Sequence, residues 1–367
     1  MKKTVVYGLL ASLLLVACKN DDSDFSAYTD ATGTITTIYI NYNGTTASVS
    51  GDSQGVVSVS GADVTVTSQY ADSLLLVLSG STTDGSLLVY RSRKYGILLN
   101  GVSIHNADGP AINNQGKKSL FLKCAAGTTN TLTDGTAYAE APYNASGEQI
   151  DQKGALFSEG QIFFLGTGAL SVTGSYKHAI ASDDYIVVAD NVSLTASSSA
   201  GNGIKVNDGL WINNGTLNIS VTADAARGIK CDAEMYVTGG TTTITTSGGC
   251  VAETSETTAD DGTVTTTTDY SSAAGIKSEG AFTMSGGTLT VTTTGTNNYS
   301  KPKGIKSDTA ITVSGGTLNV TVNKSWACDN GYDDDTLNDD ELAKKRIDVL
   351  GSPTTETVTK KVVSVVY

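Results

Sequence analysis

The chain has 367 residues, a formal net charge of −13 and 39% hydrophobic residues, with 40 Gly against 4 Pro. This composition excludes a coiled coil, which needs many Ala, Glu, Lys and Leu. It also excludes collagen, because the glycines have no three-residue period, and the apolar content argues against disorder. The acidic balance argues against nucleic acid as a partner. With only two histidines, His105 and His178, a multi-His zinc site is not expected.

The N-terminus predicts a secretory signal over residues 1–17. Lys2 and Lys3 precede an apolar run of about 10–15 residues, too short to span a membrane stably. The run ends in Leu-Val-Ala-Cys, which resembles a bacterial lipobox and makes Cys18 the predicted lipidation site. An ordinary signal peptide with an incidental cysteine is the alternative. Residues 18–34 read as an acidic tether that resembles an outer-membrane export tag. We therefore expect an outer-membrane lipoprotein, exposed at the cell surface and held to the membrane only by its lipid.

An internal repeat dominates the rest of the chain. Four copies of Gly-Ile-Lys-x-(Asn/Asp/Glu) begin at Gly203, Gly228, Gly275 and Gly304, and each is followed by a short apolar strand, a turn and an alternating strand. Weaker copies lie upstream. The aliphatic column of the repeat is Ile112, Leu156, Ile180, Ile204, Ile229, Ile276 and Ile305. Its spacing gives a unit of about 24 residues, interrupted by polar insertions over about 133–152 and 249–272, the second of which reads as a surface loop.

A period of this length with alternating Val, Ile, Thr and Tyr predicts strands rather than helices. The matched position in every unit predicts that successive units stack in register, as in a single-stranded parallel β-helix. This all-β solenoid is expected over residues 35–323, with an N-terminal cap over about 35–70. An acidic C-terminal cap over 324–367 is expected to hold a short helix near Asp339–Arg346. A β-sandwich is the rival, because it also suits strands with turns every 8–12 residues, but it needs no repeated pentapeptide.

Stacking predicts two outward columns of charge. Lys205, Lys230, Lys277 and Lys306 form one, and the acidic positions two residues later form the other. One interpretation is charge compensation between the columns. The other is a binding face, in which the lysines contact glycan oxygens or uronate carboxylates and the acids hold Ca²⁺, which takes six to eight oxygens. The predicted calcium ligands are Asp183, Asp184, Asp208, Asp232, Glu279 and Asp308.

Other features give weaker indications. The acidic run Asp329–Glu341 reads either as a solvated loop or as a calcium site without EF-hand spacing. Aromatic faces suit sugar rings, although packing is the simpler reading for each one alone. The candidates are Tyr176, Tyr185, Trp211, Tyr236, Tyr299, Trp326 and Tyr332. The four cysteines after Cys18 have no CxxC spacing, and buried thiols are expected at Cys124 and Cys231.

Support for catalysis is thin. No Ser-His-Asp arrangement is visible, and the many carboxylates give no basis for choosing a glycosidase pair. A lyase would need a base, such as a lysine with a depressed pKa, beside Ca²⁺. Four equivalent lysines in one column look more structural than catalytic.

The repeats described above, together with several shorter stretches, resemble a bacterial carbohydrate-binding parallel β-helix family with pectate-lyase-like architecture. The resemblance covers roughly residues 40–323 and is carried by Leu98–Ile104, Gly109–Ile112, Thr131–Gly135, Leu170–Gly174 and the Gly-Ile-Lys repeats. It implies a right-handed parallel β-helix that binds cellulose-like and uronate-containing glycans, with bound calcium. Ala181 and Asn207 interrupt the lysine and acid columns.

We therefore expect a monomeric, non-catalytic, calcium-binding polysaccharide-binding protein. A calcium-dependent pectate-type lyase and a structural or adhesion protein remain alternatives.

Overall fold

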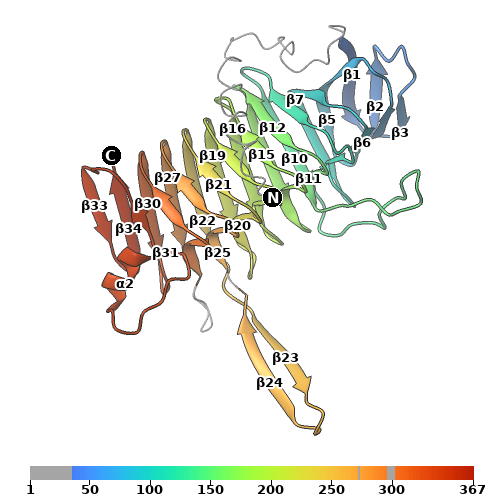
Figure 1. The fold of residues 1–367 in the computed structure, drawn as a ribbon. Helices are drawn as coiled ribbons and strands as arrows, with labels where there is room; N and C mark the ends of the chain where they lie inside the picture. The colour runs from blue at the N-terminus through green and yellow to red at the C-terminus, as the bar shows by residue number, and fades with distance from the viewer. Residues whose placement is uncertain (1–34, 272, 296–301) are drawn as a thin grey trace.

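The structure is a computed structural model that describes residues 35–271, 273–295 and 302–367. The described chain is all-β with one short helix, and most of its strands lie in two long sheets of 21 and 11 strands (Figure 1). The all-β class and the parallel pairing of repeated strands are as predicted. Within the described residues, no helix is both long and apolar enough to cross a membrane. The predicted signal, the tether and Cys18 lie outside the described residues.

The N-terminal part combines hairpins with long parallel strands. Its strands are β1 (Ile35–Gly44), β2 (Thr46–Ser50), β3 (Val57–Ser60), β4 (Asp63–Ser68), β5 (Ser73–Thr82), β6 (Ser86–Arg91) and β7 (Tyr95–Asn106). The pairs β1–β2 and β3–β4 are antiparallel, whereas β1–β5, β5–β7 and β4–β6 are parallel. The parallel ladders therefore begin already at β1 and β4, inside the segment expected to be a cap.

From residue 112 the chain repeats a set of three strands. The first strands are β8 (Ile112–Asn114), β11 (Gly154–Ser158), β14 (His178–Ser182), β17 (Ile204–Val206), β20 (Arg227–Cys231), β25 (Ala274–Ser278), β28 (Lys303–Ser307) and β31 (Cys328–Asp329). The second strands are β9 (Leu120–Cys124), β12 (Ile162–Gly166), β15 (Ile186–Val188), β18 (Leu210–Ile212), β21 (Met235–Val237), β26 (Phe282–Met284), β29 (Ile311–Val313) and β32 (Asp348–Val349). The third strands are β10 (Thr129–Asp134), β13 (Ala169–Gly174), β16 (Ser193–Ser198), β19 (Thr216–Val221), β22 (Thr241–Thr246), β27 (Thr288–Thr293) and β30 (Thr317–Val322).

Equivalent residues of successive sets face one another in these ladders. The predicted aliphatic column is continuous from Ile112 to Ile305, and all seven of its side chains are fully buried. Parallel strands stacked in this way place chemically matched side chains one strand spacing apart, about 4.8 Å. The repeat in the sequence thus becomes a set of buried and exposed columns that run along the molecule.

Two small positions in the repeat have packing reasons that the pattern alone did not supply. A Cβ on Gly275 would lie 2.2 Å from Val291 Cγ1, so the glycine lets β25 approach β27. The buried hydroxyl after the lysine closes a turn: Ser278 Oγ donates to the Gly280 carbonyl at 2.6 Å, and Ser307 Oγ donates to the same carbonyl at 2.9 Å. Cys124, Cys231, Cys250 and Cys328 are all buried, and Cys124 and Cys231 are free thiols, as predicted.

The insertion over 249–272 is more ordered than the surface loop expected from its sequence. Strands β23 (Ala252–Thr258) and β24 (Val264–Tyr270) pair in antiparallel register and project from the stack as an exposed hairpin (Figure 1). The many Thr residues favour extended backbone, and the Asp-Gly at 261–262 turns the chain. The first insertion, by contrast, contains only an isolated bridge between Tyr143 and Gln149 after β10 ends.

The C-terminal segment covers the last repeat. Its predicted short helix is present as α2 (Asp339–Lys345), and Asn338 forms a capping box with Glu341. Strands β33 (Thr355–Val358) and β34 (Val362–Val366) follow, and β34 pairs antiparallel with both β33 and β30. The free edge of β30 is thereby occupied, which removes a template for pairing with another chain.

Candidate functional site

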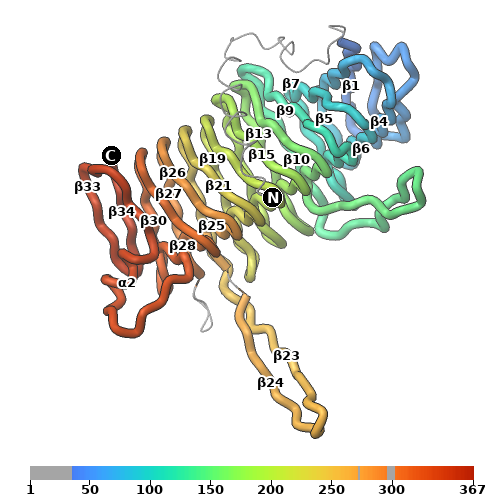
Figure 2. The backbone as a smooth tube through the Cα atoms, in the orientation of Figure 1, coloured from blue at the N-terminus to red at the C-terminus, as the bar shows by residue number. Residues whose placement is uncertain are grey.

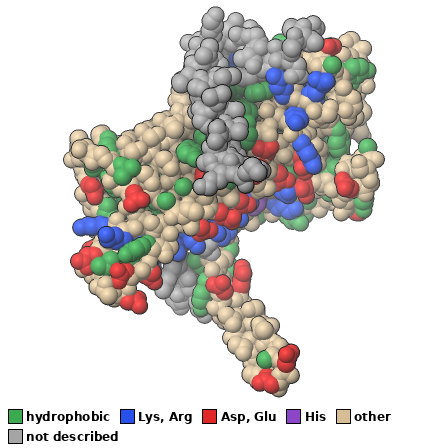
Figure 3. Space-filling model, in the orientation of Figure 1, with side chains coloured by type: hydrophobic (Ala, Val, Ile, Leu, Met, Phe, Trp, Pro, Cys, Tyr) green, Lys and Arg blue, Asp and Glu red, His purple; other side chains and the backbone are tan. Residues whose placement is uncertain are grey.

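The exposed side of the first-strand sheet carries a charged face, defined here as Lys205, Lys230, Lys277 and Lys306 with Asp232, Glu279 and Asp308. The four lysines are register neighbours across β17, β20, β25 and β28, as predicted from the pentapeptide. Figure 3 shows basic and acidic side chains running side by side in a band along the stack.

Each acid on this face lies between two lysines. Lys230 Nζ is 2.9 Å from Asp232 and 3.6 Å from Glu279, and Lys205 also pairs with Asp232. Lys277 Nζ continues the zigzag, at 4.0 Å from Glu279 and 3.7 Å from Asp308, and Lys306 closes it at 3.5 Å from Asp308. Burial raises the pKa of the Asp232 carboxyl, but its lysine partners outweigh burial and lower the pKa overall.

This arrangement is the charge compensation that was one of the two interpretations of the columns. The lysine side chains are only 16–24% exposed, so each ammonium group is largely enclosed with its partners. A calcium ion at Asp232, Glu279 or Asp308 would have to displace ammonium groups that already neutralise these carboxylates. The contacts of these three acids therefore do not fit calcium.

The N-terminal end of the same face has a different charge balance, because Phe157 and Ala181 occupy the lysine position in β11 and β14. Here Asp151, Glu159 and Asp183 form an acidic cluster whose carboxylate oxygens lie within 4.8 Å of one another. Three like charges at this separation repel strongly unless a cation neutralises them.

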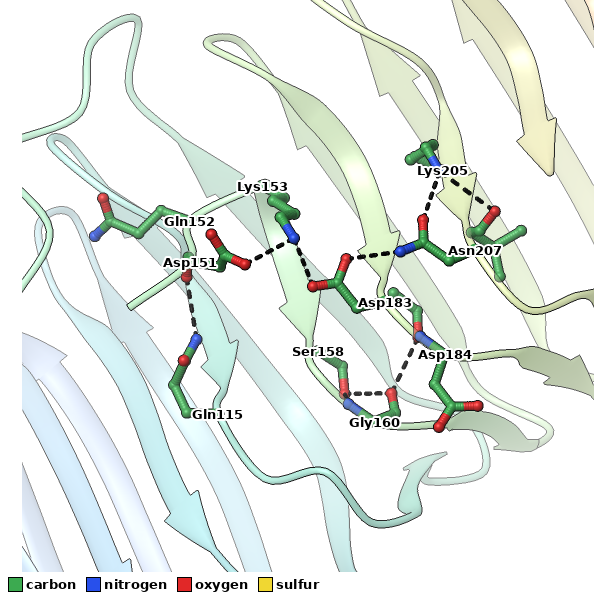
Figure 4. Close-up of polar contacts among 12 residues, drawn as sticks. Gln115, Asp151, Gln152, Lys153, Ser158, Gly160, Asp183, Asp184, Lys205 and Asn207 are labelled. Carbon is green, nitrogen blue, oxygen red and sulfur yellow. Dashed lines mark hydrogen bonds and ion pairs between the residues drawn. The ribbon is translucent and has the colours of Figure 1, made fainter. Parts of the chain in front are cut away.

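One lysine enters this cluster. Lys153 Nζ is 2.7 Å from Asp151 and 2.5 Å from Asp183, while Asn207 donates to Asp183 Oδ1 at 3.2 Å (Figure 4). Burial raises the pKa of Glu159, and the charges of Asp183 and Asp151 raise it further, outweighing the opposing charge of Lys153. One ammonium group among three carboxylates leaves the cluster with net negative charge.

The other predicted calcium ligands are distributed differently. Asp183 lies in the acidic cluster, but Asp184 points away from it, accepting from Gln161 and from the Tyr185 N–H at 2.9 Å (Figure 4). Asp208 is exposed on the turn after β17. The structure therefore does not bring the six predicted ligands together.

Sequence reasoning did not assign Asp151 or Glu159 to the metal site. Glu159 belongs to the acid column of the repeat, and this position in the sequence could have identified it as a candidate metal ligand. Asp151 lies at the end of the first insertion, where no period places it beside the column.

The acidic run Asp329–Glu341 is not arranged as a single calcium loop. Asp329 is buried and pairs with Lys303 and with Arg346 at 2.8 Å. Asp334 accepts from the Thr336 backbone and hydroxyl, and Asn338 caps α2. The run thus serves hydrogen bonds and ion pairs inside the C-terminal segment.

Several candidate aromatic residues lie in one row on the outward side of the second-strand sheet. The ring centroids of Tyr185 and Trp211 are 5.6 Å apart, and those of Trp211 and Tyr236 are stacked at 5.5 Å. Phe163 extends the row at 5.8 Å from Tyr185. Tyr176 stands apart beside Tyr138, and Tyr299 lies outside the described residues. These contacts agree with packing as the simpler reading, and they leave Trp211 and Tyr236 partly exposed.

The fold and the charged face define an all-β protein of long parallel sheets with lysine and carboxylate columns on one side. The chain belongs to the carbohydrate-binding domain-containing protein family, whose match spans residues 60–338. It is similar in fold to a polysaccharide lyase-like protein from C. thermocellum, solved as a gadolinium derivative, with a TM-score of 0.56 and 20% identity over 76% of this chain and 96% of that chain. No curated protein matches the chain.

Proposed function

We propose that this protein binds polysaccharide at the cell surface without turning it over, and that calcium takes part. Membership of a carbohydrate-binding family is the observation that carries the first half of this proposal. The acidic cluster, which Lys153 neutralises only in part, supports the second half. Plant-type glycans, cellulose-like or uronate-containing, are the proposed ligands, with the lysine column offering donors to hydroxyl and carboxylate oxygens.

The acidic cluster suits calcium better than the rest of the acid column. Asp151, Glu159 and Asp183 supply carboxylate oxygens, which hard cations prefer, and the pKa of Glu159 is raised by burial and, in addition, by the charges of Asp183 and Asp151. Calcium bound here would relieve that repulsion and would offer open coordination positions to a uronate carboxylate. The proposed ligands thus change from the six predicted residues to Asp183 with Asp151 and Glu159.

The proposal also covers the architecture of the protein and its location in the cell. The matched registers of three-strand sets support a parallel β-helix of about 24 residues per turn over residues 35–323. The general preference for right-handed crossovers between parallel strands supports its right-handed winding. Cys18, after the apolar segment, supports lipid anchoring in the outer membrane. Globomycin, which blocks lipoprotein signal cleavage, should leave the unprocessed precursor in cells, whereas a Cys18→Ser variant should lose incorporation of labelled palmitate.

Retention on insoluble glycans tests the function. The purified chain is passed over polygalacturonate and cellulose in calcium and then in EDTA. We expect retention on at least one glycan, with weaker retention on polygalacturonate in EDTA. A chain that is retained on neither glycan, and that gives only background on a broad glycan array, would instead support a structural or adhesion role.

A calcium-dependent lyase is the second candidate, because the contact of Lys153 with the acidic cluster places a lysine beside the proposed calcium site. A lyase base must accept the α-proton of a uronate. Burial lowers the pKa of Lys153, but its hydrogen bonds to Asp151 and Asp183 outweigh burial and raise the pKa overall. The ammonium group therefore stays protonated at neutral pH and is a poor base. Lyase products carry a conjugated double bond, so new ultraviolet absorbance on polygalacturonate would establish the enzyme.

A further inference from the structure

The C-terminal segment forms a cavity that is separate from the charged face. It is a hollow of about 430 Å³ beside the last repeat. Figure 2 shows the path of the backbone there, from β30 past α2 to β33 and β34. The side chains that matter here are Lys303, Lys324, Trp326, Asp329, Arg346 and Lys360. This volume falls in the range of about 300–1,000 Å³ that small-ligand sites occupy.

The lining of this C-terminal cavity is cationic in a protein of net charge −13. Four cationic side chains line it against two carboxylates, Asp329 and Asp333, and one of the four, Lys360, also pairs with Asp339 outside the cavity at 2.9 Å. Asp329 is already consumed by Lys303 and Arg346, and Asp333 is largely exposed at its rim. Lys324 is exposed and makes no ion pair or hydrogen bond within the described residues. With Asp339 counted, the cations still outnumber the carboxylates around the cavity, and this balance favours an anionic ligand.

Arg346 supplies a donor without a partner. The residue is only 7% exposed, and its guanidinium carbon lies 4.0 Å from the ring centroid of Trp326. One terminal nitrogen donates to Asp329 at 2.8 Å, and the other is 3.5 Å from Asp333. Its Nε is buried and has no hydrogen-bond partner within the described part of the chain. A buried guanidinium donor left unpaired is costly, and a carboxylate is the group it pairs with best.

We propose that the C-terminal cavity binds the carboxylate of a uronate unit in an acidic polysaccharide. Arg346 Nε, Lys324 and Lys360 donate to the carboxylate, while Trp326 holds the guanidinium group flat and gives the sugar ring an apolar wall. The cavity is too large to be filled by a bare oxyanion, whereas a pyranose ring with its carboxylate suits it. Arg346 and Lys360 lie beyond the family match at residues 60–338. The choice of a glycan ligand rests on the proposed function.

The binding in this cavity is direct and needs no metal, which separates it from calcium-bridged binding at the acidic cluster. Isothermal titration of the full chain with trigalacturonate, in EDTA, is the test, with cellotriose as the neutral probe of equal length. We expect trigalacturonate to bind and cellotriose to give no heat. Loss of trigalacturonate binding in EDTA would overturn the proposal. So would displacement of trigalacturonate by inorganic phosphate or sulfate at equal concentration.

Matched variants locate the binding. Lys324→Gln alone should weaken trigalacturonate roughly two- to five-fold, as expected for one exposed charge contact. Lys324→Gln with Lys360→Gln should weaken it by about ten-fold or more. Lys361→Gln removes an exposed charge next in sequence that does not line the cavity, and it should leave affinity unchanged. Equal affinity in the double variant and the wild type would overturn the proposal.

An Arg346→Lys variant tests the guanidinium itself. It keeps the positive charge beside Asp329 but loses the planar guanidinium group with its Nε donor, so the affinity for trigalacturonate should fall. A melting curve shows whether the variant still folds. Because Lys324 and Lys360 lie near the surface, their variants decide the question even if Arg346→Lys unfolds. Retention of the double variant on polysaccharide in calcium separates the two proposals. If the double variant keeps both this retention and its affinity for trigalacturonate, the proposed uronate site in the cavity is wrong and the proposed function stands.

Discussion

At the scale of single residues, His178 shows how the stacked charges govern ionisation. Its Nδ1 accepts the Asn202 N–H at 2.9 Å, which requires the neutral ring. Burial lowers the pKa of His178 to about 4, and the nearby charges of Lys205 and Lys177 add to this. An unfolded histidine titrates near 6.5, so between pH 6.5 and 4 the unfolded state binds the extra proton. Folding stability must therefore fall as pH is lowered through that window.

His178→Gln tests this linkage, because Gln also offers an acceptor to Asn202 but does not titrate. We expect the variant to have a flatter stability curve between pH 7 and 4. Relative to it, the wild type should lose about 3 kcal/mol, the value of a shift of this size. Urea unfolding at several pH values measures both curves, and the carboxylates that titrate in both proteins cancel in the difference. Parallel curves would contradict the assignment.

Glu159 carries the corresponding prediction for the acidic cluster. Since its pKa is raised in the folded state, its charged form opposes folding at neutral pH, and this cost disappears as pH falls below its ordinary value. Glu159→Gln should therefore raise the melting temperature in EDTA. It should also remove most of the stabilisation by calcium, which for one native-state site is about 2.7 kcal/mol at a hundred times Kd.

Asp308→Asn is the matched control for the calcium prediction. Asp308 lies in the same acid column, but Lys277 and Lys306 already neutralise it. Its calcium-dependent melting shift should equal that of the wild type. If Asp308→Asn abolished the shift and Glu159→Gln kept it, the calcium site would have to lie among the lysines.

At the scale of elements, the approach of first and third strands depends on the glycine of the pentapeptide. A Cβ at position 275 would lie 2.2 Å from Val291 Cγ1 and 2.9 Å from the Gly304 carbonyl, and neither β27 nor β28 can move freely within its ladder. Gly275→Ala should destabilise the protein by about 1–3 kcal/mol, the usual cost of overpacking. Urea unfolding measures the loss.

Val291→Ala provides the double-mutant test of this contact. It costs stability alone by opening a cavity, but it removes the atom that the new Cβ meets. The double variant should therefore be more stable than the sum of the two single effects, by a coupling of about 0.5–2 kcal/mol. Additive effects would show that the strain lies against the backbone instead.

At the scale of the whole molecule, the features that could be predicted from the sequence are those that the repeat places at equivalent positions. The buried column from Ile112 to Ile305 and the lysine column follow from stacking, because equivalent positions in each repeat must meet. The zigzag ion pairs depend on side-chain rotamers that no period specifies. Asp151 reaches the acidic cluster from an insertion, and Arg346 reaches its cavity from α2, so neither could be placed by counting residues. The hairpin β23–β24 was missed as structure because both its faces are exposed and polar.

A stack of parallel strands must also end without an unpaired edge strand, and in this chain β34 pairs with the last strand. That strand pairs antiparallel along β30 over Thr317–Thr321, and it buries Val363 and Val365. Removing residues 355–367 should expose the β30 edge and cause concentration-dependent self-association, measured by size-exclusion chromatography with light scattering. Deleting the exposed hairpin over 252–270, a larger excision, should leave the protein monodisperse.

Lysines placed on the exposed edge of β30 distinguish self-association by edge pairing from aggregation caused by general unfolding. In the truncated chain, Asn319→Lys and Thr321→Lys place like charges on the outward positions of β30 without touching the buried residues Leu318 and Val320. Edge pairing would then bring these lysines against another chain, and self-association should be suppressed. The truncated protein would then aggregate less with the lysines than without them. Equal aggregation would show that it is caused by the loss of Val363 and Val365 from the core and not by an open edge.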